Sequence, residues 1–174
     1  TPMLYGINKA GVGIGTNGFQ AVKADSNQRT GESAAVRLNV MNRDEGSARS
    51  NPYTGTEPEI HRSGVAPSIS FGLGTPHEVT LSHLWVKTRD NADYGIPFVN
   101  RRPNEAMAKA GNYYGVDAGF DNSDTNVTTA SYLHTISPDT QWRTVLRKAN
   151  YKRSYWAVAG QGTLTAASTS GQAK

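Results

Sequence analysis

Arginine and aromatic residues gather in two segments of this chain, residues 43–59 and 90–123, that are also rich in Gly, Pro, Asn and Tyr. Arginine supplies a fixed charge and forked hydrogen-bond donors, and aromatic rings supply flat apolar contact. Together they suit an anionic ligand that carries flat groups, although polar loops also hold such residues without binding anything. The candidate ligand-binding residues are Arg43, Arg49, Tyr94, Phe98, Arg101, Arg102, Tyr113, Tyr114 and Phe120.

Other chemical motifs in the chain favour neither catalysis nor metal binding. Residues 13–18 match G-x-G-x-x-G, but a strand rather than a helix is expected after them, so a glycine-rich hairpin is favoured over a nucleotide site. The four histidines lack the tight spacing of a zinc site, no G-x-S-x-G elbow occurs, and cysteine is absent. The aspartates of residues 90–124 lack EF-hand spacing and favour turns. We therefore predict no enzyme, no catalytic residue, no metal site and no cofactor.

Strict alternation of apolar and polar residues predicts the strands that must position these loops. In residues 65–73, Val65, Ile69 and Phe71 fall on one face with Pro67 and Leu73, and small or polar residues fall on the other. Val36, Leu38 and Val40 alternate in the same way. Asn-Gly at residues 17–18 predicts a tight hairpin. Strands are expected at residues 10–15, 19–25, 33–41, 60–73, 78–87, 125–136 and 140–151, with one short helix at most within residues 102–110.

The connections between these strands alternate in length. Residues 30–31, 74–76 and 137–139 form short turns, whereas residues 43–59 and 90–123 form long loops. Hydrophobic residues make up only 36% of the 174 residues, with a mean hydropathy of −0.57. A transmembrane β-barrel accounts for both observations, because only its lipid-facing positions must be apolar and its long loops lie at one end. The fold class predicted is all-β, an antiparallel meander of about seven strands that resembles part of such a barrel.

Charge and composition set the remaining expectations. The net charge of +4 and pI near 9.4 fit a moderately basic surface, and nucleic-acid binding is the less favoured interpretation. Residues 160–174 are almost entirely Gly, Ser, Thr, Ala and Gln, which predicts a disordered tail after a domain of residues 1–159.

Four segments carry a resemblance to a known family. Residues 35–49 (AVRLNVMNRDEGSAR), 63–76 (SGVAPSISFGLGTP) and 93–103 (DYGIPFVNRRP) resemble TonB-dependent siderophore receptors of the bacterial outer membrane, and residues 13–28 resemble their first barrel hairpin. The match runs from about residue 10 to about residue 155. It corresponds to the N-terminal part of the barrel, and no plug domain or TonB box is recognisable in the sequence.

The resemblance implies a role in iron transport, with the catecholate type favoured among siderophores. The expected partners are a ferric siderophore, which would itself hold the iron, outer-membrane lipid, and TonB only through a plug domain that these residues do not include. The loops would contact the ligand. The alternative is a soluble or self-assembling β-rich structural or binding protein, extracellular or at the cell surface, that joins copies through strand edges.

Overall fold

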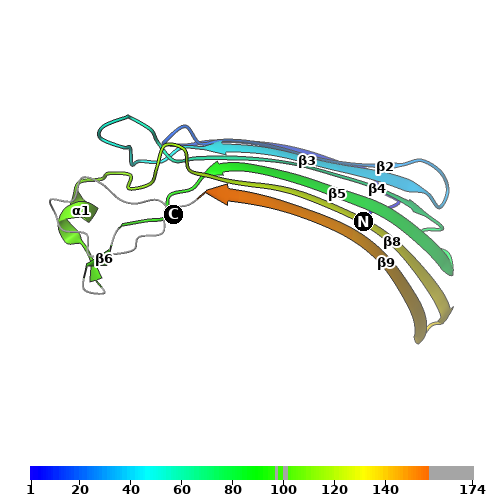
Figure 1. The fold of residues 1–174 in the computed structure, drawn as a ribbon. Helices are drawn as coiled ribbons and strands as arrows, with labels where there is room; N and C mark the ends of the chain where they lie inside the picture. The colour runs from blue at the N-terminus through cyan, green and yellow to red at the C-terminus, as the bar shows by residue number, and fades with distance from the viewer. Residues whose placement is uncertain (97, 100–101, 157–174) are drawn as a thin grey trace.

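The computed structural model describes residues 1–96, 98–99 and 102–156, and these residues form one large sheet. Seven antiparallel strands follow the chain order β1-β2-β3-β4-β5-β8-β9, and the sheet is strongly curved (Figure 1). The prediction of an all-β meander of about seven strands is confirmed. The predicted tail and the domain boundary at residue 159 lie outside the described residues. The strands are β1 Ile7–Ile14, β2 Gln20–Arg29, β3 Ala35–Glu45, β4 Glu59–Phe71, β5 His77–Asn91, β8 Phe120–Ser137 and β9 Thr140–Trp156.

Three small elements lie between β5 and β8. They are the strands β6 (Phe98–Val99) and β7 (Arg102–Pro103), which pair with each other, and the helix α1 (Glu105–Lys109). The predicted short helix is therefore confirmed within a narrower range. In the described part of the chain, no helix has the length and apolarity needed to cross a membrane.

The register of the sheet gives it one apolar and one polar face. Val40, Val65 and Trp85 are direct partners across β3, β4 and β5, so their side chains share a face, and alternate residues project to the opposite face. We call the face that carries Val40 the apolar face and the other the polar face. The apolar band on that face consists of Ala10, Val12, Ile14, Val22, Ala24, Val36, Leu38, Val40, Val65, Pro67, Ile69, Phe71, Val79, Leu81, Trp85, Ala130, Tyr132, Trp142 and Leu146.

The predicted alternation is confirmed except at one position. Leu73 lies in the turn after β4 and not on the strand. The turn must begin there because Gly72 has φ +71°, and a Cβ at Gly72 would lie 1.9 Å from the carbonyl oxygen of His77. β5 begins at His77, one residue before the predicted strand 78–87.

The two long loops lie at one end of the sheet, as predicted, and the short turns at residues 30–34, 72–76 and 138–139 lie at the other (Figure 1). The short turn between β1 and β2, residues 15–19, lies at the long-loop end. Two loop boundaries were predicted wrongly. β3 continues to Glu45, so Arg43 belongs to a strand, and β8 begins at Phe120, so the second loop spans residues 92–119. The ladder extends past the apolar band through polar partners such as Asp90 and Asp121, because backbone pairing requires no apolar side chain.

The sheet is a single layer without an ordinary core. Among the described residues the buried apolar side chains are few, namely Ala35, Tyr113 and Val127 with Pro2 and Pro58, and most of the apolar band is exposed. The polar face carries bidentate ion pairs between neighbouring strands, such as Arg37 with Asp25, at 2.8 and 2.6 Å. These side chains are partly open to solvent, so the pairs contribute little to stability. The fold therefore requires that something else cover the apolar band.

The first residues of the chain lie on the polar face. Asn27 of β2 is fully buried, its Nδ2 donates to the carbonyl oxygens of Met3 (2.8 Å) and Tyr5 (2.6 Å), and its Oδ1 accepts from the Met3 amide (3.0 Å). Arg37 donates to the carbonyl oxygen of Thr1 at 3.1 Å. One asparagine thus holds residues 1–5 against the sheet by satisfying backbone groups outside the ladder.

Candidate functional site

The two long loops, residues 46–58 and 92–119, are joined to each other. Arg49 forms an ion pair with Asp93 at 2.7 Å, and both side chains are partly buried. Ser50 and Asn112 form a parallel bridge. Asp117 accepts a hydrogen bond from the Thr54 hydroxyl at 2.9 Å and another from the side-chain amide of Asn51 at 3.2 Å. The loops therefore form one unit at the end of the sheet.

Tyr113 lies at the centre of this junction. Its side chain is only 3% exposed, its amide donates to the carbonyl oxygen of Ser50 at 2.9 Å, and its hydroxyl donates to Oδ1 of Asn91 at 2.9 Å. Burial, with the nearby charge of Asp93 as a smaller cause, raises the pKa of Tyr113 above the ordinary tyrosine value. A Cβ at Gly115 would lie 2.0 Å from this hydroxyl, so glycine is required there.

The helix α1 is fastened to the same loop by two polar contacts. The Oδ1 of Asn104 caps it by accepting from the amides of Ala106 (3.1 Å) and Met107 (3.2 Å). The Tyr114 hydroxyl donates to the carbonyl oxygen of Met107 at 3.0 Å. Of the predicted site residues, Arg49, Tyr113 and Tyr114 therefore hold the loops in place rather than offering free side chains.

Other predicted residues remain open to a ligand. Tyr94 is 55% exposed, Phe98 in β6 is 66% exposed, and Arg102 in β7 is exposed. Phe98 pairs with Pro103 where β6 and β7 run antiparallel. The second loop therefore has one exposed guanidinium group, of Arg102, and two exposed aromatic rings, of Tyr94 and Phe98.

Tyr53, which is 86% exposed in the first loop, was not among the predicted residues. Asn51 supports it, because its Oδ1 accepts from the Tyr53 amide at 3.0 Å and its carbonyl oxygen accepts from the amide of Gly55 at 2.8 Å. The sequence Asn-Pro-Tyr-Thr-Gly is typical of a turn and would have indicated a residue at a loop tip.

Arg43 and Phe120 are not brought together as predicted. Arg43 lies on the polar face of β3, pairs with Glu45, and places its guanidinium 5.4 Å from the centre of the Phe19 ring. Phe120 begins β8 on the apolar face, where it pairs with Trp156. Strand alternation therefore separates them. Arg101 lies outside the described residues.

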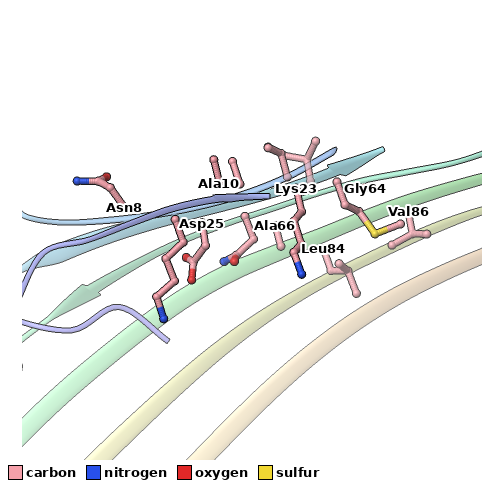
Figure 2. A pocket seen from close by; sticks show the side chains of 14 residues that line it. Asn8, Ala10, Lys23, Asp25, Gly64, Ala66, Leu84 and Val86 are labelled. Atoms are coloured by element: carbon pink, nitrogen blue, oxygen red, sulfur yellow. The ribbon is translucent and has the colours of Figure 1, made fainter. Parts of the chain in front are cut away.

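A hollow of about 830 Å³ on the polar face was also not predicted. Figure 2 shows Lys23 and Asp25 on the same side of the sheet as Leu84 and Val86, with Asn8 and Ala10 on the other side. The hollow combines charged groups with an apolar floor, and its lining comes from five strands. The periodicity of single segments could not predict this hollow, because its lining residues meet only when the five strands pair. Within the described residues, no group of three or more His, Cys, Asp or Glu side chains could hold a metal ion.

Comparison with known proteins gives consistent relatives, although no family model matches. The chain is 33% identical over 166 residues to the catecholate siderophore receptor Fiu of Escherichia coli O157:H7, covering 88% of this chain and 21% of that protein. It is 32% identical over 150 residues to the probable TonB-dependent siderophore receptor PiuA of Acinetobacter baumannii, covering 82% and 19%. The chain thus spans about a fifth of the length of these relatives.

Solved structures of the same receptors superpose on the sheet. The crystal structure of PiuA from Acinetobacter baumannii has a TM-score of 0.77 at 27% identity, with 90% of this chain and 23% of that chain covered. The open form of the ferric-catecholate import receptor Fiu from Escherichia coli K12 has a TM-score of 0.80 at 30% identity, with 97% and 27% covered. The resemblance inferred from the sequence is confirmed, and the seven strands match part of a receptor barrel.

Proposed function

We propose that this chain, whose homologues are the TonB-dependent siderophore receptors of the outer membrane, forms part of an outer-membrane barrel wall and supplies loops that capture a ferric siderophore. The observation that carries the proposal is the agreement of sequence and fold along most of the chain with receptors for ferric catecholates. The role is binding for transport and includes no catalysis.

The direction of the apolar band supports a lipid-facing surface. In β1 the apolar band is centred on Val12, and a line of direct partners across the strands leads from Val12 to Lys152 in β9. In β9, however, the band is centred on Thr144, between Trp142 and Leu146. The band therefore shifts eight residues along the strands, about 26 Å, over six inter-strand spacings, about 29 Å. If the band lies parallel to a membrane, the strands tilt about 40°, as in transmembrane barrels.

The exposed loop residues suit an iron-catecholate complex. Such a complex is anionic and presents aromatic rings, so the Arg102 guanidinium can pair with its charge while Tyr94, Phe98 and Tyr53 contact the rings. The iron would be held by the siderophore. Arg49, Tyr113 and Tyr114 serve as positioning residues, because their polar groups are already bonded within the loops.

The remaining steps of uptake belong to the whole receptor. TonB would act through a plug domain, and the residues described here would contribute binding only. Within the described part of the sheet, β1 and β9 each pair on one side. The rest of a barrel, or another copy of the chain, would join at these strands because their open backbone groups need partners in a membrane.

Fluorescence titration of the 174-residue chain in detergent micelles with a ferric tris-catecholate complex tests the proposal. Alanine at Tyr94 or Phe98 and glutamine at Arg102 should each weaken binding about 5- to 30-fold, as expected for central aromatic and arginine contacts. The matched control is Arg143→Gln, the same charge change at the short-turn end of β9. The metal-free catechol controls for non-specific quenching. Absence of saturable binding, or equal effects of Arg102→Gln and Arg143→Gln, would refute the proposed loop contacts.

A further inference from the structure

Basic residues cluster on the apolar face of β5, β8 and β9, immediately beyond the apolar band on the side of the long loops. Lys87 and Lys152 lie directly opposite Asp124 on its two neighbouring strands. Lys148 and Lys152 flank Asn150, whose direct partner on β8 is Asn126. We call this group, with Arg89, the basic cluster; its members are Lys87, Arg89, Lys148 and Lys152, around Asp124, Asn126 and Asn150.

The cations of this cluster outnumber their counterion. Asp124 is engaged by Arg89, whose Nη2 donates to its two carboxylate oxygens at 3.1 and 2.8 Å. Arg89 is further fixed because its Nη1 donates to the Ser123 carbonyl oxygen at 3.1 Å. In the part of the chain that the structure describes, none of the ion pairs within 4.0 Å includes one of the three lysines. Three uncompensated ammonium groups therefore surround two asparagine amides that can also donate.

Two carboxylates lie on the same face, on the strands next to the cluster. Asp44 on β3 and Glu59 on β4 both bond to His61, at 2.7 and 3.1 Å, and His61 is the direct partner of Arg89 on β5. The positive potential is consequently confined to one side of the sheet, between β5 and β9. A local positive potential of this kind favours the binding of one anionic group at this position.

The cluster also lies at the height of membrane headgroups. Lys87 is the next residue after Trp85 on the apolar face of β5, two residues further along the chain, and Lys148 follows Leu146 on β9 at the same spacing. With a tilt of about 40°, Lys87 is about 15 Å above Leu81 along the membrane normal and Lys152 is about 20 Å above Thr144, whereas the apolar zone of a barrel extends about 12 Å from its centre. Lys148 is about 10 Å above Thr144, just inside this zone, and its flexible side chain can extend toward the headgroups. Cations at that height meet phosphate groups, and apolar side chains below them meet acyl chains.

We propose that the basic cluster binds the phosphoryl headgroup of an anionic membrane lipid, whose acyl chains lie along Leu81, Trp85 and Leu146. The lysine ammonium groups and the Asn126 and Asn150 amides donate to the phosphate oxygens. Charge complementarity and the apolar band directly below the cluster select an amphiphile over a soluble anion. This inference rests on the lipid-facing orientation in the proposed function.

Tryptophan quenching by brominated lipids tests the inference, because all three tryptophans, Trp85, Trp142 and Trp156, lie on the apolar face. A variant with phenylalanine at positions 142 and 156 leaves Trp85 as the reporter beside Lys87. The chain is incorporated into phosphatidylcholine vesicles that contain either brominated phosphatidylcholine or brominated phosphatidic acid. The relative association constant of the anionic lipid over the neutral one is then obtained from the quenching curves.

We expect the anionic lipid to be preferred about 100-fold, with each lysine-to-glutamine change lowering the ratio about fivefold. In the triple variant K87Q/K148Q/K152Q the ratio should fall close to one. The matched control is the triple variant K9Q/K23Q/R147Q, which removes the same number of charges from the polar face of the same sheet. That control should retain the preference.

The possible results separate the inference from the proposed function. Equal quenching by both lipids, unchanged in K87Q/K148Q/K152Q, overturns the headgroup site but leaves the lipid-facing orientation intact. Absence of quenching by either lipid overturns that orientation and the inference with it. If inorganic phosphate at matched ionic strength abolishes the preference as completely as the triple variant, the cluster is a site for soluble phosphate and the lipid assignment is wrong.

Discussion

Replacing Leu81 with arginine should strongly reduce the affinity of the chain for a bilayer. Leu81 lies near the middle of the apolar band, where its direct partners are Ile69 on β4 and Ala130 on β8. Its side chain is 46% exposed, so an arginine fits there sterically and no packed core is disrupted. The substitution therefore measures the environment of the apolar face rather than a packing defect.

The magnitude follows from the depth of Leu81 in the band. Arginine on the lipid face of a barrel costs about 2–4 kcal/mol at the bilayer midplane and about 0–1 kcal/mol near the interfaces. Because about 1.4 kcal/mol corresponds to a factor of ten, the partition constant between vesicles and water should fall about 30- to 1,000-fold. Ser82 is the neighbouring residue on the polar face, so Ser82→Arg should change the constant about threefold or less.

Partition of the 174-residue chain into phosphatidylcholine vesicles, followed by tryptophan fluorescence and confirmed by flotation, measures both variants. A conservative Leu81→Val variant controls for the loss of leucine itself. Equal effects of arginine at positions 81 and 82 would show that the two faces are not distinguished by lipid. A Leu81→Arg variant that partitions like the unmodified chain would refute the lipid-facing orientation.

Three further predictions concern the loops and the first residues. A double-mutant cycle of Arg49→Gln and Asp93→Asn, measured by urea unfolding of the loops, should give a coupling free energy of about 0.5–1 kcal/mol; a zero coupling would contradict the ion pair. Tyr113→Phe should destabilise the loops by about 1–2 kcal/mol, seen as faster amide exchange in both loops together. Because the pKa of Tyr113 is raised in the folded state, the stabilisation of the loops by its neutral hydroxyl is complete at pH values below the ordinary tyrosine pKa. This stabilisation is lost as the pH rises through the folded-state pKa, which tyrosinate absorbance and near-UV circular dichroism can follow. Asn27→Ala should accelerate exchange of the Met3 amide about tenfold, and unchanged exchange would refute the proposed clamp.

The strand pairs were predictable because their signals are local. In Val65–Phe71 the apolar side alternates strictly, and in Val79–Trp85 it is interrupted only at His83 and Leu84. The register then pairs Val65 with Trp85 and Phe71 with Val79. Predictions failed where polar residues continue a strand. The Gly and Pro content of residues 43–59 predicts a loop that begins at Arg43, yet β3 extends past Arg43 through backbone pairing with β4.

The candidate site was only partly predictable, since residue type does not reveal whether a side chain is already bonded. Tyr113 and Tyr94 look alike in the sequence, but Tyr113 is buried with its hydroxyl bonded to Asn91, whereas Tyr94 is exposed. Arg49 and Arg102 differ in the same way, because only Arg49 meets an aspartate from the other loop.

The sequence by itself determined the period of two along each strand, the alternation of short and long connections, and the homology to siderophore receptors. These properties depend on neighbours in the chain, which the amino-acid order specifies directly. The tertiary structure decided which loop side chains stay free, how the apolar band crosses the sheet, and that Lys87, Asp124 and Lys152 lie in one row. Those features depend on the register between strands and on contacts between distant loops, which backbone pairing sets and no single segment encodes.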